Sequence, residues 1–400
     1  MLVGLAAYAV LAGADFGAGF WELAGGRSEH ARDQRDLAHH AMGPVWEANH
    51  VWLIFVLVVC WTAYPVAFGS ITSTLAVPLF IAGIGIILRG TAYALRSGTT
   101  TAREQRRVEV AVAGSSILTP FALGTVVGGI ASGRVPVGNA AGNLVTSWLN
   151  PTSIMLGVLA VATAAYLAAV YLAADAVRVG RGDLERDFRA RALGTAVVAG
   201  GAALAGLVVL RFDARPIWDG LTSGAGLAAV VVSALGGIGT VVFVLRRRYE
   251  PARVTAAVAV AAIVAGWGLA QRPQFLPGLT IDQAAAGRST LVSLLVSLAL
   301  GAVVLVPSLA FLFTLVLRGR FDESAEPPAA EPEPGSARAS RRLLPVAAVC
   351  LVAGAAVTAL VDSAWGRVVG IPLLFASIVL AFLAIAPALS AVAAHEDDLP

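Results

Sequence analysis

Apolar stretches long enough to cross a lipid bilayer recur from one end of this 400-residue sequence to the other. A spanning helix needs roughly 20 apolar residues, because about 30 Å of hydrocarbon must be crossed at about 1.5 Å per residue. Hydrophobic residues make up 58% of the chain and charged residues 13%, which leaves too little polar surface for a soluble protein of this length. The sequence therefore predicts an all-α fold, a polytopic transmembrane helix bundle. The eleven predicted spans are residues 1–23, 47–66, 74–95, 109–131, 152–176, 192–210, 224–245, 253–270, 289–317, 343–361 and 369–389.

The arginines predict how this bundle is oriented. All 28 basic residues are arginine, and the predicted loops on one side carry three to five each, whereas those on the other side carry none to two. Because basic loops remain in the cytoplasm, we expect the first loop, residues 25–42, and the C-terminus inside the cell and the N-terminus outside. Arg89 lies within the third span near its basic end, where its side chain is expected to snorkel to the interface.

Composition divides the chain into three predicted regions. A segment rich in Pro, Glu, Ala and Ser follows the ninth span, and such a segment buries too little apolar surface to order itself. The regions are a transmembrane domain at 1–321, a flexible cytoplasmic linker at 322–342 and a two-helix transmembrane extension at 343–400. The first ten residues lack a basic stretch and a cleavage signature, so we expect a retained first helix. No repeat is evident, and the spacing of Cys60 and Cys350 suggests neither a disulfide nor a metal site.

Acidic side chains within the spans point to function, because a carboxylate in hydrocarbon is costly unless it faces protein or water. Asp15 and Glu22 are seven residues apart and share a helix face, with Asp15 about 10 Å deeper. The glycines around Asp15 also fit a tight helix crossing that holds one satisfied polar group. Pro44 is expected to start the second helix, which would place Glu47 in its first turn, where the helix dipole favours a carboxylate. We interpret Asp15, Glu22 and Glu47 as a candidate proton route from the cytoplasm.

Four more side chains surround Glu47 in the sequence and are candidates for supporting roles: Trp46, Asn49, His50 and Trp52. His50 lies three residues after Glu47 and is within its reach on a helix. The alternative interpretation is an interfacial anchor, with the two tryptophans in an aromatic belt and Glu47 and His50 as a solvated pair. The sequence leaves both interpretations open.

Haem binding by this chain itself is not expected, because a haem ligand must be a His, Met or Cys held inside the bundle, usually with a second one opposite. His39 and His40 lie in a predicted loop, and only His50 of the five histidines could enter the bundle. Met42 lies at an interface and Met155 stands alone in the fifth span. The sequence has no metal-spaced cluster, phosphate loop or catalytic triad, and nothing in it indicates a nucleic-acid partner.

Two motifs give the sequence a family resemblance. Residues 13–19, Gly-Ala-Asp-Phe-Gly-Ala-Gly, are followed by a basic loop and by residues 43–54, Gly-Pro-Val-Trp-Glu-Ala-Asn-His-Val-Trp-Leu-Ile. This combination resembles subunit II of cytochrome bd-type quinol oxidases. Leu-Asn-Pro at 149–151 and Val-Val-Leu-Val-Pro at 303–307, followed by Arg-Gly-Arg at 318–320, extend the resemblance over roughly residues 1–322.

The resemblance implies a subunit of a terminal oxidase that reduces O2 in the bacterial cell membrane. It places haem b, haem d and quinol oxidation in a partner subunit I, and in some members of the family subunit II holds a structural quinone. The resemblance also implies that Asp15, Trp46 and Glu47 take part in conducting protons to the oxygen-reducing haem. Asn49 matches an amide of the family pattern. About nine helices would be those of the family, and the last two would form a C-terminal pair of extra transmembrane helices.

The sequence departs from the family pattern in three ways, which limits how far the family's roles can be assigned to its residues. Many members have Asp at the position of Glu47 and Gln at that of His50, and some have an acid where this chain has Ala12. The C-terminal extension carries no motif, and we expect it to cover a flank where other oxidases hold a small accessory subunit. A proton-coupled secondary transporter and a purely structural scaffold remain as alternatives, although the clustering of the acids at one end of two helices argues against a transporter.

Overall fold

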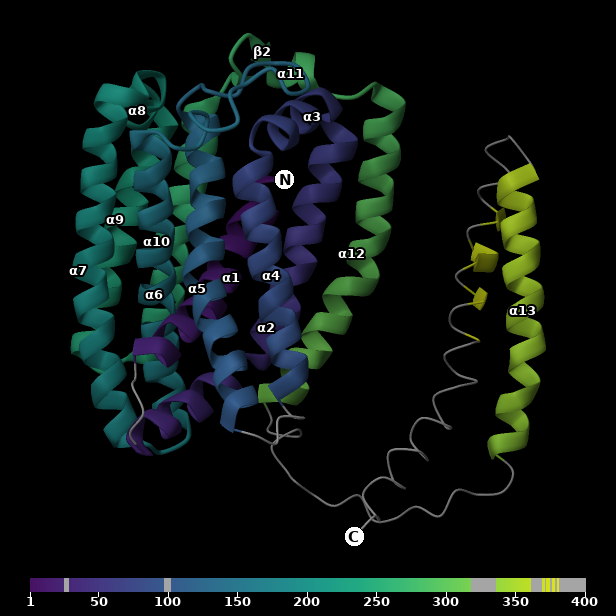
Figure 1. Cartoon of the computed structure of the whole chain (residues 1–400), viewed down its shortest axis with the longest axis horizontal. Helices are drawn as coiled ribbons and strands as arrows, with labels where there is room; N and C mark the ends of the chain where they lie inside the picture. Colours follow the sequence, from purple (N-terminus) through teal and green to yellow (C-terminus); the bar gives the residue numbers. More distant parts are fainter. Residues whose placement is uncertain are drawn as a thin grey trace. The chain divides into compact units, whose positions relative to one another are not determined.

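The structure is a computed structural model that describes residues 1–24, 29–96, 102–317, 336–360, 369–370, 372–374, 376–377 and 380. The chain divides into two compact units, Met1–Arg318 and Gly319–Pro400 (Figure 1). The helices of the first unit are α1 (Leu2–Ala24), α2 (Glu29–Ala63), α3 (Pro65–Thr74), α4 (Ala76–Arg96), α5 (Ala102–Ala131), α6 (Pro151–Arg178), α7 (Gly182–Asp213), α8 (Arg215–Leu221), α9 (Gly224–Leu245), α10 (Tyr249–Gln271), α11 (Ile281–Ala284) and α12 (Arg288–Leu317). Helices satisfy their own backbone hydrogen bonds, as a chain in lipid requires.

The predicted all-α transmembrane bundle is confirmed. Within the described residues, seven helices are long and apolar enough to cross a membrane, or eight if α2 and α3, which are bent by 119°, count as one span. The third and tenth predicted spans correspond to shorter apolar helices, Ala76–Thr91 and Leu343–Val357. The eleventh predicted span lies mostly outside the described residues.

Helix α2 begins well before the predicted position. Its backbone is helical from Glu29 and passes Pro44 without a break, so Glu47 does not lie in the first turn of a helix and the expected helix-dipole effect on it is wrong. The reason is tertiary packing. Leu37 and Ala38 are buried in the main hydrophobic core, and this packing offsets the helix-breaking tendency of proline.

The first unit contains a repeat that the sequence did not reveal. Helices α1 to α5 and helices α6 to α10 follow the same order: two long helices, a short one, and two long ones. The breaks before the short helices have nearly the same backbone geometry, with φ −137° and ψ 58° at Tyr64 and φ −141° and ψ 58° at Ala214. A proline follows each break, at Pro65 and Pro216. We call α1–α5 the first half and α6–α10 the second half.

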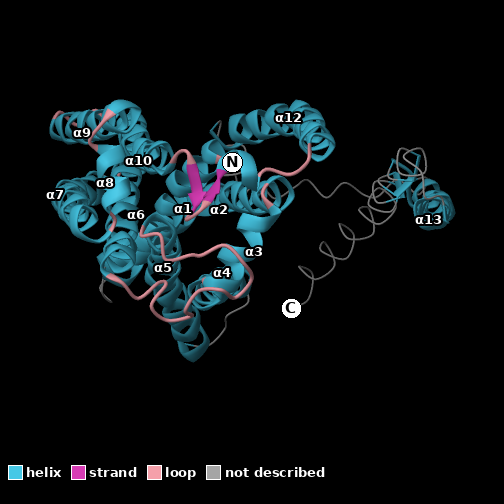
Figure 2. Ribbon diagram, turned by 90° about the horizontal axis from the view of Figure 1, so that it is seen from above, coloured by secondary structure: helices cyan, strands magenta, loops and turns pink. Residues whose placement is uncertain are grey.

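The two halves meet along α1 and α6. A Cβ atom added at Gly17 of α1 would lie 1.9 Å from the carbonyl oxygen of Ala164 on α6, so only glycine permits this approach. The main hydrophobic core surrounds this crossing and contains side chains from α1, α2, α6, α7, α9 and α10. At one end of the bundle, α3, α8, α11 and the two short antiparallel strands β1 (Gln274–Leu276) and β2 (Leu279–Thr280) lie across the helix ends (Figures 1 and 2).

The second unit contains helix α13 (Ser336–Leu360). A Cβ atom added at Gly354 would lie 2.9 Å from the backbone nitrogen of Leu374 and 3.0 Å from the carbonyl oxygen of Gly370, so α13 packs closely on a second helical segment. Helix α13 begins at Ser336, inside the segment 322–342 that the composition predicts to be a flexible linker. The division into three regions stays a prediction.

Candidate functional site

A buried ion pair connects α1 and α4 in the first half. The Arg89 guanidinium donates from Nε to Asp15 Oδ2 at 3.0 Å and from Nη2 to Asp15 Oδ1 at 2.5 Å. Its Nη2 also donates to the Asp15 carbonyl oxygen at 2.6 Å. The two side chains are only 3% and 1% exposed. The expected snorkelling of Arg89 is therefore wrong, because a buried carboxylate offers this arginine a better partner than the interface does.

Two neighbouring helices add further polar contacts to this pair. Asn49 of α2 donates from Nδ2 to Asp15 Oδ2 at 3.1 Å, and Arg89 donates from Nη1 to Ser116 Oγ of α5 at 2.9 Å. The guanidinium carbon of Arg89 also lies 5.1 Å from the centre of the Phe16 ring. We call Asp15, Asn49, Arg89 and Ser116 the buried network. All four residues are buried, and each comes from a different long helix of the first half.

Glycine makes room for the buried network on α1. A Cβ atom added at Gly19 would lie 2.1 Å from Ser116 Oγ and 2.7 Å from Arg89 Nη1. The glycines near Asp15 therefore have two packing roles: Gly17 permits the close crossing of α1 and α6, and Gly19 leaves space for the Arg89 side chain.

The chemistry of this arrangement is that of a fixed charge pair. Both carboxylate oxygens of Asp15 accept hydrogen bonds from Arg89, and charge-assisted bonds of this bidentate kind are the strongest that side chains form. Removing one partner of a buried pair leaves an uncompensated charge, which costs about 3–5 kcal/mol. The geometry therefore favours a pair that stays together inside the bundle.

The structure brings together only some of the predicted site residues. Asp15 and Asn49 are in direct contact, and Glu22 is half-buried near the end of α1. His50 and Trp52 are half-buried on α2. Trp52 packs edge-on against Phe55, with ring centres 5.8 Å apart, and against a core cluster formed by α1, which is unlike a side chain in an interfacial belt. The backbones of Trp46 and Glu47 are helical, and their side chains lie outside the described residues.

Arg89 and Ser116 were missed as site residues in the sequence. The available signal was that Arg89 is the single charged residue within its predicted span, since an intramembrane charge commonly pairs with an opposite charge inside the bundle. Pairing across 74 residues could not be read from local spacing. Ser116 carried no signal, because serine is common in packed transmembrane helices.

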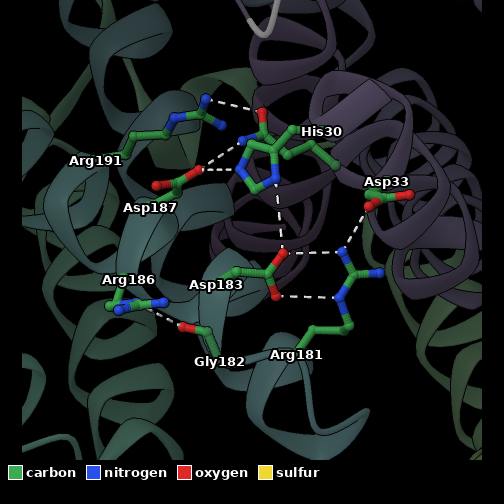
Figure 3. A network of polar contacts seen from close by, with 9 residues as sticks. His30, Asp33, Arg181, Gly182, Asp183, Arg186, Asp187 and Arg191 are labelled. Carbon is green, nitrogen blue, oxygen red and sulfur yellow. Dashed lines mark hydrogen bonds and ion pairs between the residues drawn. The ribbon is translucent and has the colours of Figure 1, made fainter. Parts of the chain in front are cut away.

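A second polar cluster lies at the end of the bundle opposite α3 and α8, where the start of α2 meets the start of α7 (Figure 3). His30, Asp33 and Asp183 each offer one ligand atom to a common point, and these atoms lie within 4.8 Å of one another. Arg181 donates to Asp33 at 2.6 Å and to Asp183 at 3.1 and 2.9 Å. Because the Arg181 guanidinium already donates to both carboxylates, we assign no metal ion to the cluster.

Comparison with known proteins covers the first unit. Residues 1–316 match the family described as cytochrome bd terminal oxidase subunit II. A protein of Bacillus subtilis (strain 168) described as "Putative cytochrome bd menaquinol oxidase subunit II" is 24% identical in an alignment of 329 residues that covers 78% of this chain and 92% of the relative. A chain in the solved structure of the bd oxidase from Geobacillus thermodenitrificans is 27% identical and has a TM-score of 0.65, with 79% of this chain and 96% of that chain covered.

Proposed function

We propose that this chain, which belongs to the cytochrome bd terminal oxidase subunit II family, pairs with a haem-bearing subunit I to form a quinol oxidase of the respiratory membrane. The relative from Bacillus subtilis and the bd oxidase from Geobacillus thermodenitrificans support this assignment. In the proposed complex, electrons from membrane quinol reduce O2 to water. This subunit supports its partner structurally and supplies protons, and the redox chemistry takes place in subunit I.

The haems of the proposed complex, haem b and haem d, belong to subunit I. They supply the electron transfer and the O2 binding that amino-acid side chains do not provide. In this proposal, the acidic residues of this chain hold and transfer the protons that the reaction consumes, and the Asn49 amide positions them. We assign no haem ligand to this chain, and we leave a structural quinone, as held by some family members, without assigned residues.

We propose that the membrane orientation is the one that the arginines predict, with the N-terminus outside and the C-terminus in the cytoplasm of a bacterial cell. Seven apolar helices of spanning length support a multi-pass protein. In this orientation, the end of α1 with Glu22 and the first part of α2 face the cytoplasm. Protons consumed in O2 reduction would then come from the cytoplasm, which conserves energy.

The observation that carries the proposed proton route is the hydrogen bond between Asn49 and Asp15. Asn49 lies two residues after Glu47 on α2, so its bond to the Asp15–Arg89 pair fixes the part of α2 that carries Glu47. Asp15 belongs to the proposed route and is held in place by Arg89 and Asn49. Glu22 and Glu47 remain the groups that take up and release protons, and Trp46, His50 and Trp52 support them.

Replacement of Glu47 tests this role. In the assembled oxidase, we expect Glu47→Gln to lower quinol-driven O2 uptake by roughly 100-fold, the effect typical of losing a positioned proton donor or acceptor. Glu47→Asp should retain most of the activity, because it keeps the carboxylate. Glu250→Gln is the matched control, since this glutamate belongs to the second half and is 71% exposed. Unchanged turnover of Glu47→Gln at every pH would contradict the proton route and favour a purely structural subunit.

The C-terminal extension has a separate proposed role. Residues 317–400 lie beyond the family match, and α13 packs closely on a second helical segment. We propose that this helix pair covers a flank where other oxidases hold a small accessory subunit. A chain that is truncated after Phe321, yet assembles with full activity and thermal stability, would contradict this role.

A further inference from the structure

Helix α2 joins two sites in one continuous helix. It carries Glu47 and Asn49 within the bundle, and it begins at Glu29 beside the start of α7. We call residues 29–41 of α2 the α2 arm. From His30 to Glu47 the helix advances about 26 Å, at about 1.5 Å per residue. Any contact that fixes or releases the α2 arm therefore acts on the segment that carries Glu47.

Both ring nitrogens of His30 face carboxylates of α7. Nε2 lies 2.5 Å from Asp187 Oδ2, and Nδ1 lies 3.6 Å from Asp183 Oδ2 (Figure 3). A neutral imidazole has one N–H donor and one lone pair, and an ionised carboxylate only accepts. The neutral ring would therefore turn a lone pair toward one of the two carboxylates. The imidazolium donates from Nε2 to Asp187 and attracts the Asp183 carboxylate by charge, at a distance too long for a hydrogen bond.

The surrounding charges also favour a cation at this position. Among the described residues, the charged groups of the cluster are Asp33 from α2, Asp183, Asp187 and Arg191 from α7, and Arg181 just before α7. A further guanidinium, that of Arg186, lies nearby and donates to the carbonyl oxygen of Gly182 (Figure 3). The groups that face the two ring nitrogens of His30 are both carboxylates, which attract a cation. Gln34 completes the contacts: it donates to Asp187 at 2.9 Å and accepts from Arg191 at 2.9 Å.

We propose that His30 is a positioning residue whose proton holds the α2 arm against α7. When His30 is protonated, it clasps Asp183 and Asp187 and fixes the helix that leads to Glu47. When it is neutral, one of the two contacts becomes repulsive and the α2 arm loosens. Proton uptake through Glu47 thereby depends on the pH at this end of the bundle. The effect on uptake rests on the proposed proton route, whereas the clasp itself does not.

Hydrogen–deuterium exchange in the intact, purified oxidase tests the clasp. Exchange of backbone amides in residues 30–38 is compared at about pH 6 and about pH 8, the range in which a histidine ordinarily changes charge, after correction for intrinsic rates. We expect protection of the α2 arm to fall by about twofold to fivefold at the higher pH, as suits partly exposed ion pairs. Helix α8, at the opposite end of the bundle, is the control segment and should show no change.

Two variants separate the charge from the shape of the side chain. His30→Arg is cationic at both pH values and should keep the α2 arm protected at both. His30→Gln is neutral at both pH values and should leave the amides of the α2 arm weakly protected at either pH. The O2 uptake of His30→Arg should persist further toward alkaline pH than that of the unmodified oxidase. Equal protection of the unmodified arm at both pH values, or a His30→Gln variant that still responds to pH, would overturn the clasp.

The proton route and the His30 clasp are tested by different measurements, so either one can be contradicted without the other. Normal turnover of Glu47→Gln would remove the proton route without changing the exchange of the α2 arm. Exchange that is independent of pH would remove the clasp without changing the effect of Glu47→Gln.

Discussion

The two halves of the first unit share one order of helices but place their charges at different depths. In the first half, Asp15 lies nine residues from the nearer end of α1 and pairs with Arg89 inside the bundle. In the second half, the carboxylates of the described ion pairs lie within two turns of a helix end. Asp175 near the end of α6 contacts Arg253 at 2.5 Å, Glu185 in the first turn of α7 accepts from Tyr249, and Asp213 at the end of α7 contacts Arg134 at 2.6 Å.

This difference shows that the first half holds a charge pair deep among its helices, whereas the second half keeps its charges near the helix ends. The carboxylates of Asp175 and Glu185 are also buried, but each lies within two turns of a helix end and not deep in the bundle. A charge pair deep in an apolar bundle is tolerated only with a complete set of partners, which the first half supplies from four helices. We therefore propose that the proton route lies in the first half and that the second half acts as its scaffold.

Removing the buried cation should give the largest difference in stability between equivalent changes in the two halves. Arg89→Met leaves Asp15 buried without its partner, and we expect a loss of about 3–5 kcal/mol in the free energy of unfolding. The measurement is the thermal stability and yield of the assembled oxidase. Arg178→Met is the matched control, because Arg178 of the second half is 48% exposed and should matter by less than about 0.5 kcal/mol. Equal losses for both variants would remove the distinction between the halves.

Removing the amide of Asn49 should have the next largest effect. Asn49→Ala deletes the hydrogen bond to the Asp15 carboxylate, and a bond to a charged group contributes about 1.5–3 kcal/mol. Because α2 also loses its link to the buried network, quinol-driven O2 uptake should fall together with the melting temperature. Asn49→Asp places a second carboxylate beside Asp15 and should be worse than Asn49→Ala. The reverse order would contradict the contact.

A methyl group at the crossing of the two halves should cost somewhat less. In Gly17→Ala the new Cβ atom meets the backbone of α6 at Ala164, and overpacking of this kind costs about 1–3 kcal/mol. Gly237→Ala is the control in α9, because a Cβ atom there meets nothing within 4 Å. That variant should be neutral or slightly stabilising, since alanine is the better helix former. Chemical or thermal unfolding of the purified oxidase distinguishes the two results.

The smallest expected effect concerns a polar contact inside the second half. Thr240 is buried on α9 and its hydroxyl lies 2.8 Å from that of Thr255 on α10. Thr240→Val removes this contact and should cost about 1 kcal/mol or less, with O2 uptake unchanged. A loss of activity without a loss of stability would show that the second half takes part in function, which would revise the comparison.

Much of the fold could be predicted from the sequence because apolar length is a local property. Each span predicted within residues 1–317 corresponds to a helix of the structure, since about 20 apolar residues in a row have few other solutions in lipid. The repeat could not be predicted in this way. It lies in backbone geometry, as at Tyr64 and Ala214, where the backbone angles agree but the side chains differ.

The sequence by itself determined the class of protein and the family resemblance that the match over residues 1–316 confirms, and it singled out Asp15 and Asn49 as unusual groups in apolar helices. Only the tertiary structure decided what those groups contact. Arg89 lies 74 residues from Asp15, and His30 lies 157 residues from Asp187. Such contacts depend on how helices pack rather than on spacing along one helix. Packing also decided where α2 begins, because core contacts near Leu37 and Ala38 outweigh the helix-ending signal of Pro44.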